Sequence, residues 1–181
     1  MKTITLNRFL EQKDVYINEI RDLSINQKRK IFVYPTDTIY GIGAIYTLEN
    51  IKKIFEIKKR DSKKMFSIIA PSFEWIQKNY PQADIKKLKE HLKKYHGVTY
   101  IFDYSKPGVR IIKHPIQEFV KKLGVPFITT SCNISGEPIV VDVKKIPKEI
   151  ANQVDYIVDG GILGGKPSVL IDLVSGKIIE R

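Results

Sequence analysis

The chain has only one cysteine, Cys132, so an internal disulfide is impossible. No apolar run approaches the roughly 20 residues that a membrane-spanning helix requires. Residues 1–8 lack the long apolar stretch followed by small residues that marks a secretory signal peptide. These absences lead us to expect a cytoplasmic protein without a membrane partner.

Several familiar catalytic and metal-binding patterns are also missing. The three histidines do not have the spacing of a zinc site, and there is no signal of a Ser-His-Asp triad. The glycine cluster at 160–165 fits neither the dinucleotide-binding pattern nor the Walker pattern. No histidine lies near Cys132 in the sequence, which favours a small buried thiol over a catalytic nucleophile. We therefore predict no metal site built by the protein.

Positive charge, in contrast, is plentiful. Lysine and arginine number 31 against 20 acidic residues, which gives a net charge of +11 and a pI near 9.6. Such a balance suits an anionic partner, for example a nucleotide, an RNA or a membrane surface. Lysine far outnumbers arginine and isoleucine is frequent, a composition that a biased genome would also produce. Charge alone leaves these two explanations equally open.

No repeat, low-complexity tract or clear linker divides the sequence, so we expect a single domain over residues 1–181. Apolar spacing predicts helices within 9–30, 49–58, 71–76, 84–95 and 116–123. Apolar and β-branched runs predict strands at 31–35, 66–70, 98–102, 109–112, 125–129 and 156–159, and a hairpin formed by 168–173 and 177–180. Because helices and strands mix without βαβ alternation, the pattern predicts an α/β fold of the α+β type, with a mixed sheet flanked by helices.

Polar residues and glycines gather at the ends of predicted elements, at 36–41, 58–64, 129–133 and 166–168. Glycine lets the backbone approach a ligand, and hydroxyl groups orient that ligand. The cations of 58–60, with the hydroxyl of Ser131 and the amide of Asn133, could hold a polyanion such as a nucleotide. Simpler explanations remain open: Thr36–Thr38 as a turn or helix cap, and Lys63–Lys64 as a solvated surface.

Taken in order, these clusters resemble the motifs of the YrdC family of threonylcarbamoyl-AMP synthases. The matching segments are 34–43, 57–64, 109–116, 123–138 and 167–172. The resemblance runs from about residue 31 to the end of the sequence, and five motifs in the same order make it specific. It implies a twisted mixed sheet flanked by helices around a basic central cavity.

The resemblance also implies a reaction. L-threonine, bicarbonate and ATP would give threonylcarbamoyl-AMP and pyrophosphate, usually with Mg²⁺. The product would serve the threonylcarbamoyl modification of the tRNA adenosine beside the anticodon. The implied partners are therefore the three substrates, possible binding to tRNA or double-stranded RNA, and a downstream tRNA threonylcarbamoyl transferase complex.

Individual residues receive roles from the same resemblance. The catalytic residues that it implies are Lys58, Arg60, Ser131 and Asn133. These four would bind ATP together with Lys64 and Arg181. Threonine would contact Thr36, Thr129 and Ser168, while Tyr40, Thr99 and Arg110 would line the cavity.

Two other functions compete with a synthase. The first is a tRNA- or double-stranded-RNA-binding module on the same fold, without synthase activity. Its basic charge fits, although the stacked-aromatic signature of an RNA recognition motif is missing. The second is a carbamoyl-transfer module like that of hydrogenase maturation proteins. Those proteins also carry zinc-finger cysteines and an acylphosphatase domain, and this sequence contains neither.

Overall fold

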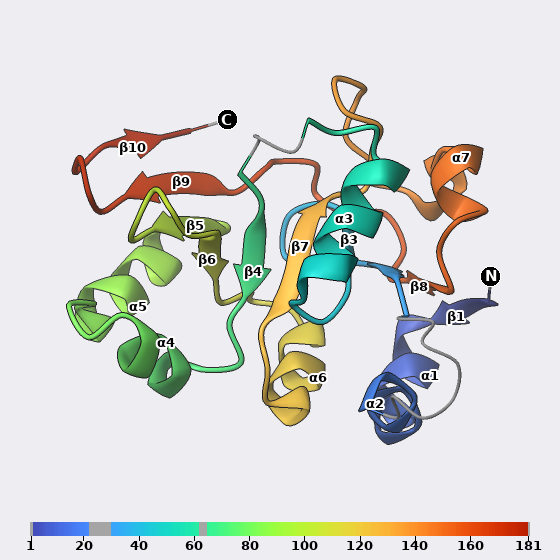
Figure 1. Ribbon diagram of the computed structural model, residues 1–181, viewed down its shortest axis with the longest axis horizontal. Helices are drawn as coiled ribbons and strands as arrows, with labels where there is room; N and C mark the ends of the chain where they lie inside the picture. The colour runs from blue at the N-terminus through green and yellow to red at the C-terminus, as the bar shows by residue number, and fades with distance from the viewer. Residues whose placement is uncertain (1, 22–29, 62–64, 181) are drawn as a thin grey trace.

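The computed structural model describes residues 2–21, 30–61 and 65–180, and the strands in these ranges form one ten-stranded sheet (Figure 1). Their order across the sheet is β1-β8-β2-β3-β7-β4-β6-β5-β9-β10. In chain order they are β1 (Lys2–Thr5), β2 (Phe32–Tyr34), β3 (Gly41–Gly43), β4 (Ser67–Ile69), β5 (Val98–Ile101), β6 (Gly108–Arg110), β7 (Phe127–Ser131), β8 (Tyr156–Asp159), β9 (Val169–Asp172) and β10 (Ile178–Ile179).

Helices flank this sheet. They are α1 (Leu6–Glu11), α2 (Lys13–Arg21), α3 (Leu48–Ile57), α4 (Phe73–Asn79), α5 (Ile85–Lys94), α6 (Ile116–Leu123) and α7 (Lys148–Ala151), with a 3-10 turn at Val143–Lys145. Within the described ranges, no helix combines the length and the apolar character needed to cross a membrane.

The sheet is mixed, as the sequence predicts. The central strand β7 runs antiparallel to both β3 and β4, whereas β8 runs parallel to β1 and β2. Further along, β4 pairs in parallel with β6, and β5 pairs in parallel with β9. The expected hairpin is also confirmed, since β9 and β10 pair antiparallel around Gly176, which has a φ of 75°. This topology is not that of a Rossmann domain.

Local chemistry explains where the helices begin and end. The hydroxyl of Ser72 accepts the N–H of Trp75 at the start of α4, and a carboxylate oxygen of Asp84 accepts the N–H of Lys87 at the start of α5. At the C-terminal end of α6, Gly124 adopts a left-handed φ of 75°, the conformation in which glycine commonly ends a helix. Of the helical region expected at 9–30, helix is confirmed over 9–11 and 13–21, with a turn at Gln12 between α1 and α2, and residues 22–29 lie outside the described part.

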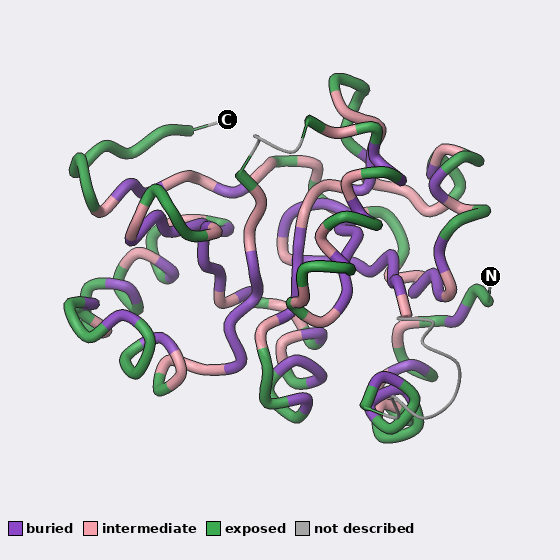
Figure 2. Tube along the Cα trace, in the orientation of Figure 1, coloured by how far each residue is buried: buried purple, intermediate pink, exposed green. Residues whose placement is uncertain are grey.

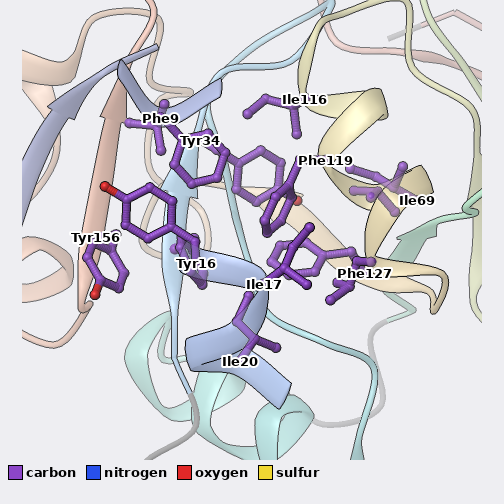
Figure 3. Close-up of a cluster of buried hydrophobic side chains, with 14 of the residues drawn as sticks. Phe9, Tyr16, Ile17, Ile20, Tyr34, Ile69, Ile116, Phe119, Phe127 and Tyr156 are labelled. Atoms are coloured by element: carbon purple, nitrogen blue, oxygen red, sulfur yellow. The ribbon is translucent and has the colours of Figure 1, made fainter. Parts of the chain in front are cut away.

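Both faces of the sheet are covered. Phe32 and Tyr34 of β2 pack into a cluster with α1, α2 and α6, an aromatic core shown in Figure 3, and Val33 faces the opposite side among residues of α3 and α7. A third cluster lies between α4, α5 and strands β5 and β6. Burial on both faces explains why the strands read as continuous apolar runs. In Figure 2 the buried residues follow the inner strands, and the exposed ones lie on helix faces, on loops and on the edge strand β10.

Strand β3 was not expected from the sequence. Gly41 and Gly43 have low strand propensity, and the strand exists because β2 and β7 pair with it on both sides. A Cβ atom added at Gly43 would lie 1.8 Å from the carbonyl oxygen of Ile128. The close approach of β3 to β7 therefore requires glycine. The strand β1 and the short helix α7 were missed as well.

We predict that Gly43→Ala lowers the free energy of unfolding by about 1–3 kcal/mol, because the added methyl group overpacks the β3–β7 contact. Urea denaturation measures the change. Gly164→Ala is the matched control, since the nearest atom to its added Cβ, His96 Nε2, is 3.9 Å away. Equal stability of the two variants would contradict the assigned contact.

Candidate active site

A cavity of about 240 Å³ lies where strands β3, β4, β5, β6 and β7 come together. Hydroxyl-bearing residues dominate its wall: Thr36, Thr38, Tyr40, Ser67, Thr99, Thr129, Thr130, Ser131 and Ser168. Two guanidinium groups, those of Arg60 and Arg110, also line it, and the described wall contains no carboxylate. The cavity wall is therefore polar and carries positive charge.

The structure brings most of the expected site residues to this cavity. The three residues expected for threonine are in the wall, together with Tyr40, Thr99 and Arg110. Of the residues expected for ATP, Arg60 and Ser131 line the cavity, whereas Lys58 and Asn133 lie behind its wall. Lys64 and Arg181 lie outside the described residues.

Thr36 builds a turn directly after β2. Its hydroxyl donates to the carbonyl oxygen of Ile39 at 2.7 Å and accepts the N–H of Thr38 at 3.1 Å. The hydroxyl oxygens of Thr36 and Thr38 are 2.9 Å apart. The expectation of turn chemistry here is confirmed. Because its hydroxyl is fully engaged, Thr36 shapes the wall and has no spare hydrogen-bond donor for a ligand.

Arg110 and Asp37 form a buried ion pair at the edge of the same turn. Arg110 Nη2 and Asp37 Oδ1 are 2.6 Å apart, and the two side chains are only 9% and 3% exposed. The same nitrogen donates to Thr38 Oγ1 at 3.3 Å, while Asp37 Oδ2 accepts the N–H of Lys113. The Nε of Arg110 is buried and has no partner among the described residues. An unmet donor on a buried guanidinium suggests a ligand acceptor.

The side chain of Lys58 is one of the most deeply buried in the molecule, at 1% exposure. Its ammonium group donates to the carbonyl oxygen of Ser131, to that of Asn133 at 2.6 Å, and to Asn133 Oδ1 at 3.2 Å. It takes part in none of the ion pairs among the described residues. Burial lowers the pKa of Lys58 to about 8. Three oxygen acceptors compensate the buried charge and tie α3 to the end of β7.

Asn133 completes the same loop. Its Oδ1 accepts the hydroxyl proton of Ser131 at 2.5 Å, and its Nδ2 donates to the carbonyl oxygen of Glu137 at 2.6 Å. Asn133 is only 7% exposed, and its amide makes hydrogen bonds within the loop. Lys58 and Asn133 thus hold Ser131 at the cavity wall.

The turn at the C-terminal end of α3 places Arg60 at the cavity wall. The N–H of Lys59 bonds to the carbonyl oxygen of Glu56 and that of Arg60 to the carbonyl oxygen of Phe55, the two bonds of a Schellman motif. Lys59 occupies the left-handed position with a φ of 49°, where glycine is usual. The guanidinium of Arg60 donates to the carbonyl oxygen of Met65, and its buried Nε has no partner among the described residues. Burial lowers the pKa of Arg60.

Cys132 is fully buried and is absent from the cavity wall. Burial raises the pKa of its thiol to about 12. A thiol with such a pKa is almost entirely protonated at neutral pH, so it is a poor nucleophile. The expectation of a buried cysteine is confirmed.

The sequence analysis did not single out Ser67, which also lines the cavity. Ser67 of β4 lies directly opposite Thr129 of β7 in the antiparallel register, so both side chains face the same side of the sheet. Only strand pairing reveals this neighbourhood, because the two residues are far apart in the sequence. No local motif marks Ser67.

Comparisons with known proteins agree on one family. A family model named Sua5/YciO/YrdC, with the description telomere recombination, matches residues 24–181. A Methanocaldococcus jannaschii protein provisionally named as a threonylcarbamoyl-AMP synthase is 36% identical over 164 residues, covering 83% of this chain and 78% of that protein. The threonylcarbamoyl-AMP synthase of Coxiella burnetii is 27% identical over 185 residues, covering 92% of this chain and 99% of that enzyme.

Solved structures share the fold. The crystal structure of P. abyssi Sua5 complexed with L-threonine has a TM-score of 0.77 at 22% identity and covers 98% of this chain. This chain spans only 55% of that protein. E. coli YciO has a TM-score of 0.76 at 22% identity, with 99% of this chain and 93% of that chain covered.

We predict that Lys58→Met changes how stability depends on pH. The pKa of Lys58 is lowered from 10.5 to about 8 by folding, so between these values the unfolded chain binds a proton that the folded chain lacks. Stability contributed by this lysine therefore rises with pH across that window. Between pH 8 and 10.5, the free energy of unfolding of the wild type should therefore rise by up to about 3 kcal/mol relative to that of Lys58→Met. Urea denaturation at a series of pH values measures this difference. The control Lys59→Met changes an exposed neighbour and should follow the wild-type curve. If the free energy of unfolding of Lys58→Met followed pH in parallel with that of the wild type, the lowered pKa of Lys58 would be refuted.

Proposed function

Because the chain belongs to the Sua5/YciO/YrdC family, we propose that it is an L-threonylcarbamoyladenylate synthase, a nucleotidyltransferase. It uses L-threonine, bicarbonate and ATP and releases threonylcarbamoyl-AMP and pyrophosphate. The observation that carries this proposal is the hydroxyl-lined cavity in which Arg60 and Arg110 each present a buried Nε without a partner among the described residues. The names of the curated relatives support it and do not favour the alternative of an RNA-binding module.

Arg110 marks the end of the cavity that suits the amino acid. The buried ion pair with Asp37 fixes one side of its guanidinium, and the unpartnered Nε leaves a donor for a carboxylate. Thr129 and Ser168 line the same cavity as Arg110. We assign the threonine carboxylate to Arg110 and its amine and hydroxyl to the group that contains Thr129 and Ser168.

Arg60 and Ser131 mark the end that suits the nucleotide. Bicarbonate first loses hydroxide to give carbon dioxide. The neutral amine of threonine then attacks that carbon, so that an N–C bond forms, one C=O π bond opens to a carboxylate oxygen and the amine proton passes to solvent, which gives a carbamate. A carbamate oxygen then attacks the α-phosphorus of ATP, and the bond to pyrophosphate breaks. Negative charge gathers in both steps, so a fixed guanidinium at Arg60 and a hydroxyl at Ser131 stabilise the transition states. Lys58 and Asn133 act by holding the loop of Ser131 in place.

We infer that the described residues hold no resident magnesium ion. The described wall of the cavity has no carboxylate, and the described residues contain no group of three or more potential metal-binding side chains. Magnesium in nucleotide enzymes is often held mainly by the phosphates. We therefore treat Mg²⁺ as part of the substrate, MgATP.

The product requires an acceptor. Threonylcarbamoyl-AMP is a mixed anhydride, so its carbonyl group is activated for transfer to an amine. We propose that a tRNA threonylcarbamoyl transferase complex in the cytoplasm consumes it to modify the tRNA adenosine next to the anticodon.

The synthase activity is tested by incubating the protein with MgATP, L-threonine and bicarbonate, and by following pyrophosphate and the carbamoyl adenylate.

We predict that Arg60→Ala weakens nucleotide binding by about 2–5 kcal/mol, because its guanidinium is partly desolvated. Calorimetry with ATP measures this loss. Arg8→Ala removes a charge from exposed α1 and serves as the control. Unchanged ATP affinity in Arg60→Ala would exclude the assignment of this arginine.

We also predict the order of amino-acid preference. Serine lacks only the methyl group of threonine, which is worth about 1–3 kcal/mol, whereas valine lacks the hydroxyl and leaves its buried polar partner unsatisfied. Serine should therefore be a poor substrate and valine a worse one. Competition of the three amino acids in the pyrophosphate assay measures the order. Valine reacting as fast as threonine would show that the hydroxyls of the wall do not face the amino-acid side chain.

A further inference from the structure

The hydroxyl group of Tyr40 grips the backbone of a distant glycine-rich loop. It accepts the N–H of Gly160 at 2.9 Å and donates to the carbonyl oxygen of Gly161 at 2.7 Å. Tyr40 itself is fully buried. Burial also raises its pKa to about 12, so the phenol keeps its proton and can donate and accept at the same time near neutral pH.

The segment that Tyr40 holds is the glycine strap, residues 160–166, which connects β8 to the cavity wall. The strap lies close against the turn that precedes Tyr40, since a Cβ atom at Gly160 would be 2.7 Å from Pro35 Cβ. Further along, the N–H of Leu163 donates to the carbonyl oxygen of Val141 at 2.9 Å. Two glycines of the strap, Gly161 and Gly165, have φ values of 76° and 80°, which side chains rarely adopt.

The strap leads directly into the cavity wall at Pro167 and Ser168. Ser168 is 4% exposed, and its hydroxyl lies 2.8 Å from that of Thr99. The next residue, Val169, donates its N–H to the carbonyl oxygen of Gly97. The backbone path of the strap therefore determines the positions of Pro167 and Ser168 in the cavity wall.

We propose that Tyr40 is a positioning residue that fixes the glycine strap and thereby pre-arranges Pro167 and Ser168 at the amino-acid end of the cavity. The identity of the amino acid rests on the proposed function. The strap contains four glycines, whose backbones are freer than those of other residues, so its order depends on such anchors. Without the hydroxyl, the ligand must order the strap itself, and binding weakens by that cost.

The test compares Tyr40→Phe with Tyr100→Phe. Both tyrosines are fully buried, and the hydroxyl of Tyr100 donates to the carbonyl oxygen of Leu88 in α5 rather than to the strap. In Tyr40→Phe we expect an about tenfold higher Kd for threonine by calorimetry, since two hydrogen bonds are lost. Amide hydrogen exchange over 160–168 should accelerate in the same variant, and ATP affinity should change much less. Tyr100→Phe should keep the wild-type Kd for threonine and the wild-type exchange of the strap.

A second variant separates positioning from direct contact. Gly160→Ala forces its Cβ against Pro35 and displaces the strap without altering Tyr40, so it should also raise the Kd for threonine. A raised Kd in Tyr40→Phe with unchanged exchange over 160–168 would mean that the phenol touches the ligand directly, and would overturn the proposal. Faster exchange with an unchanged Kd would overturn it as well.

The proposed synthase activity and the positioning role of Tyr40 can be tested separately. A wild type that binds threonine but releases no pyrophosphate would remove the synthase activity, while the Kd and exchange measurements still decide the role of Tyr40. A wild type that does not bind threonine would overturn both the amino-acid site and its positioning by the strap.

Discussion

One buried ammonium group holds together the part of the cavity that we assign to the nucleotide. Lys58 stands at the end of α3, and its Nζ contacts two carbonyl oxygens and one amide oxygen of the loop after β7. Removing an ammonium group from water is costly, so the charge is tolerated only where several acceptors surround it. That requirement fixes the spacing between α3 and the Ser131–Asn133 loop. The Schellman turn at Lys59 then brings Arg60 to the wall of the same cavity that Ser131 lines.

The amino-acid end is organised by a different principle. There, a sequence of hydrogen bonds and one ion pair fixes backbone segments that carry small polar side chains. Asp37 holds Arg110, Thr36 closes its own turn, and Tyr40 holds the strap that leads to Ser168. Much of the hydrogen-bonding capacity is used within the protein, which leaves few donors for a ligand. Such an arrangement favours selectivity, since each remaining donor is fixed in direction before the ligand arrives.

Much of this molecule could be predicted from the sequence, and the failures have identifiable causes. Long periodic segments such as α5 and α6 can be predicted because their apolar residues recur at helical spacing. Strand β3 could not be predicted, because two of its three residues are glycines, which disfavour strands, and its pairing depends on β2 and β7. The clusters at 36–41, 58–64, 129–133 and 166–168 were expected to share a cleft. Each of them contributes residues to one cavity, although Lys58 and Asn133 do not line it. The sequence did not indicate Ser67, whose place there follows from its register with Thr129.

The sequence by itself determined the chemical groups that are available and their order, because family motifs and the excess of positive charge are properties of the chain alone. It also determined that the only thiol, Cys132, has no histidine near it in the sequence. Only the tertiary structure decided which groups face the ligand and which face the protein. Arg60 and Lys58 are two residues apart, yet one lines the cavity and the other is buried behind it. The direction of a long side chain depends on which acceptors surround it after packing, and those acceptors come from residues far away in the sequence.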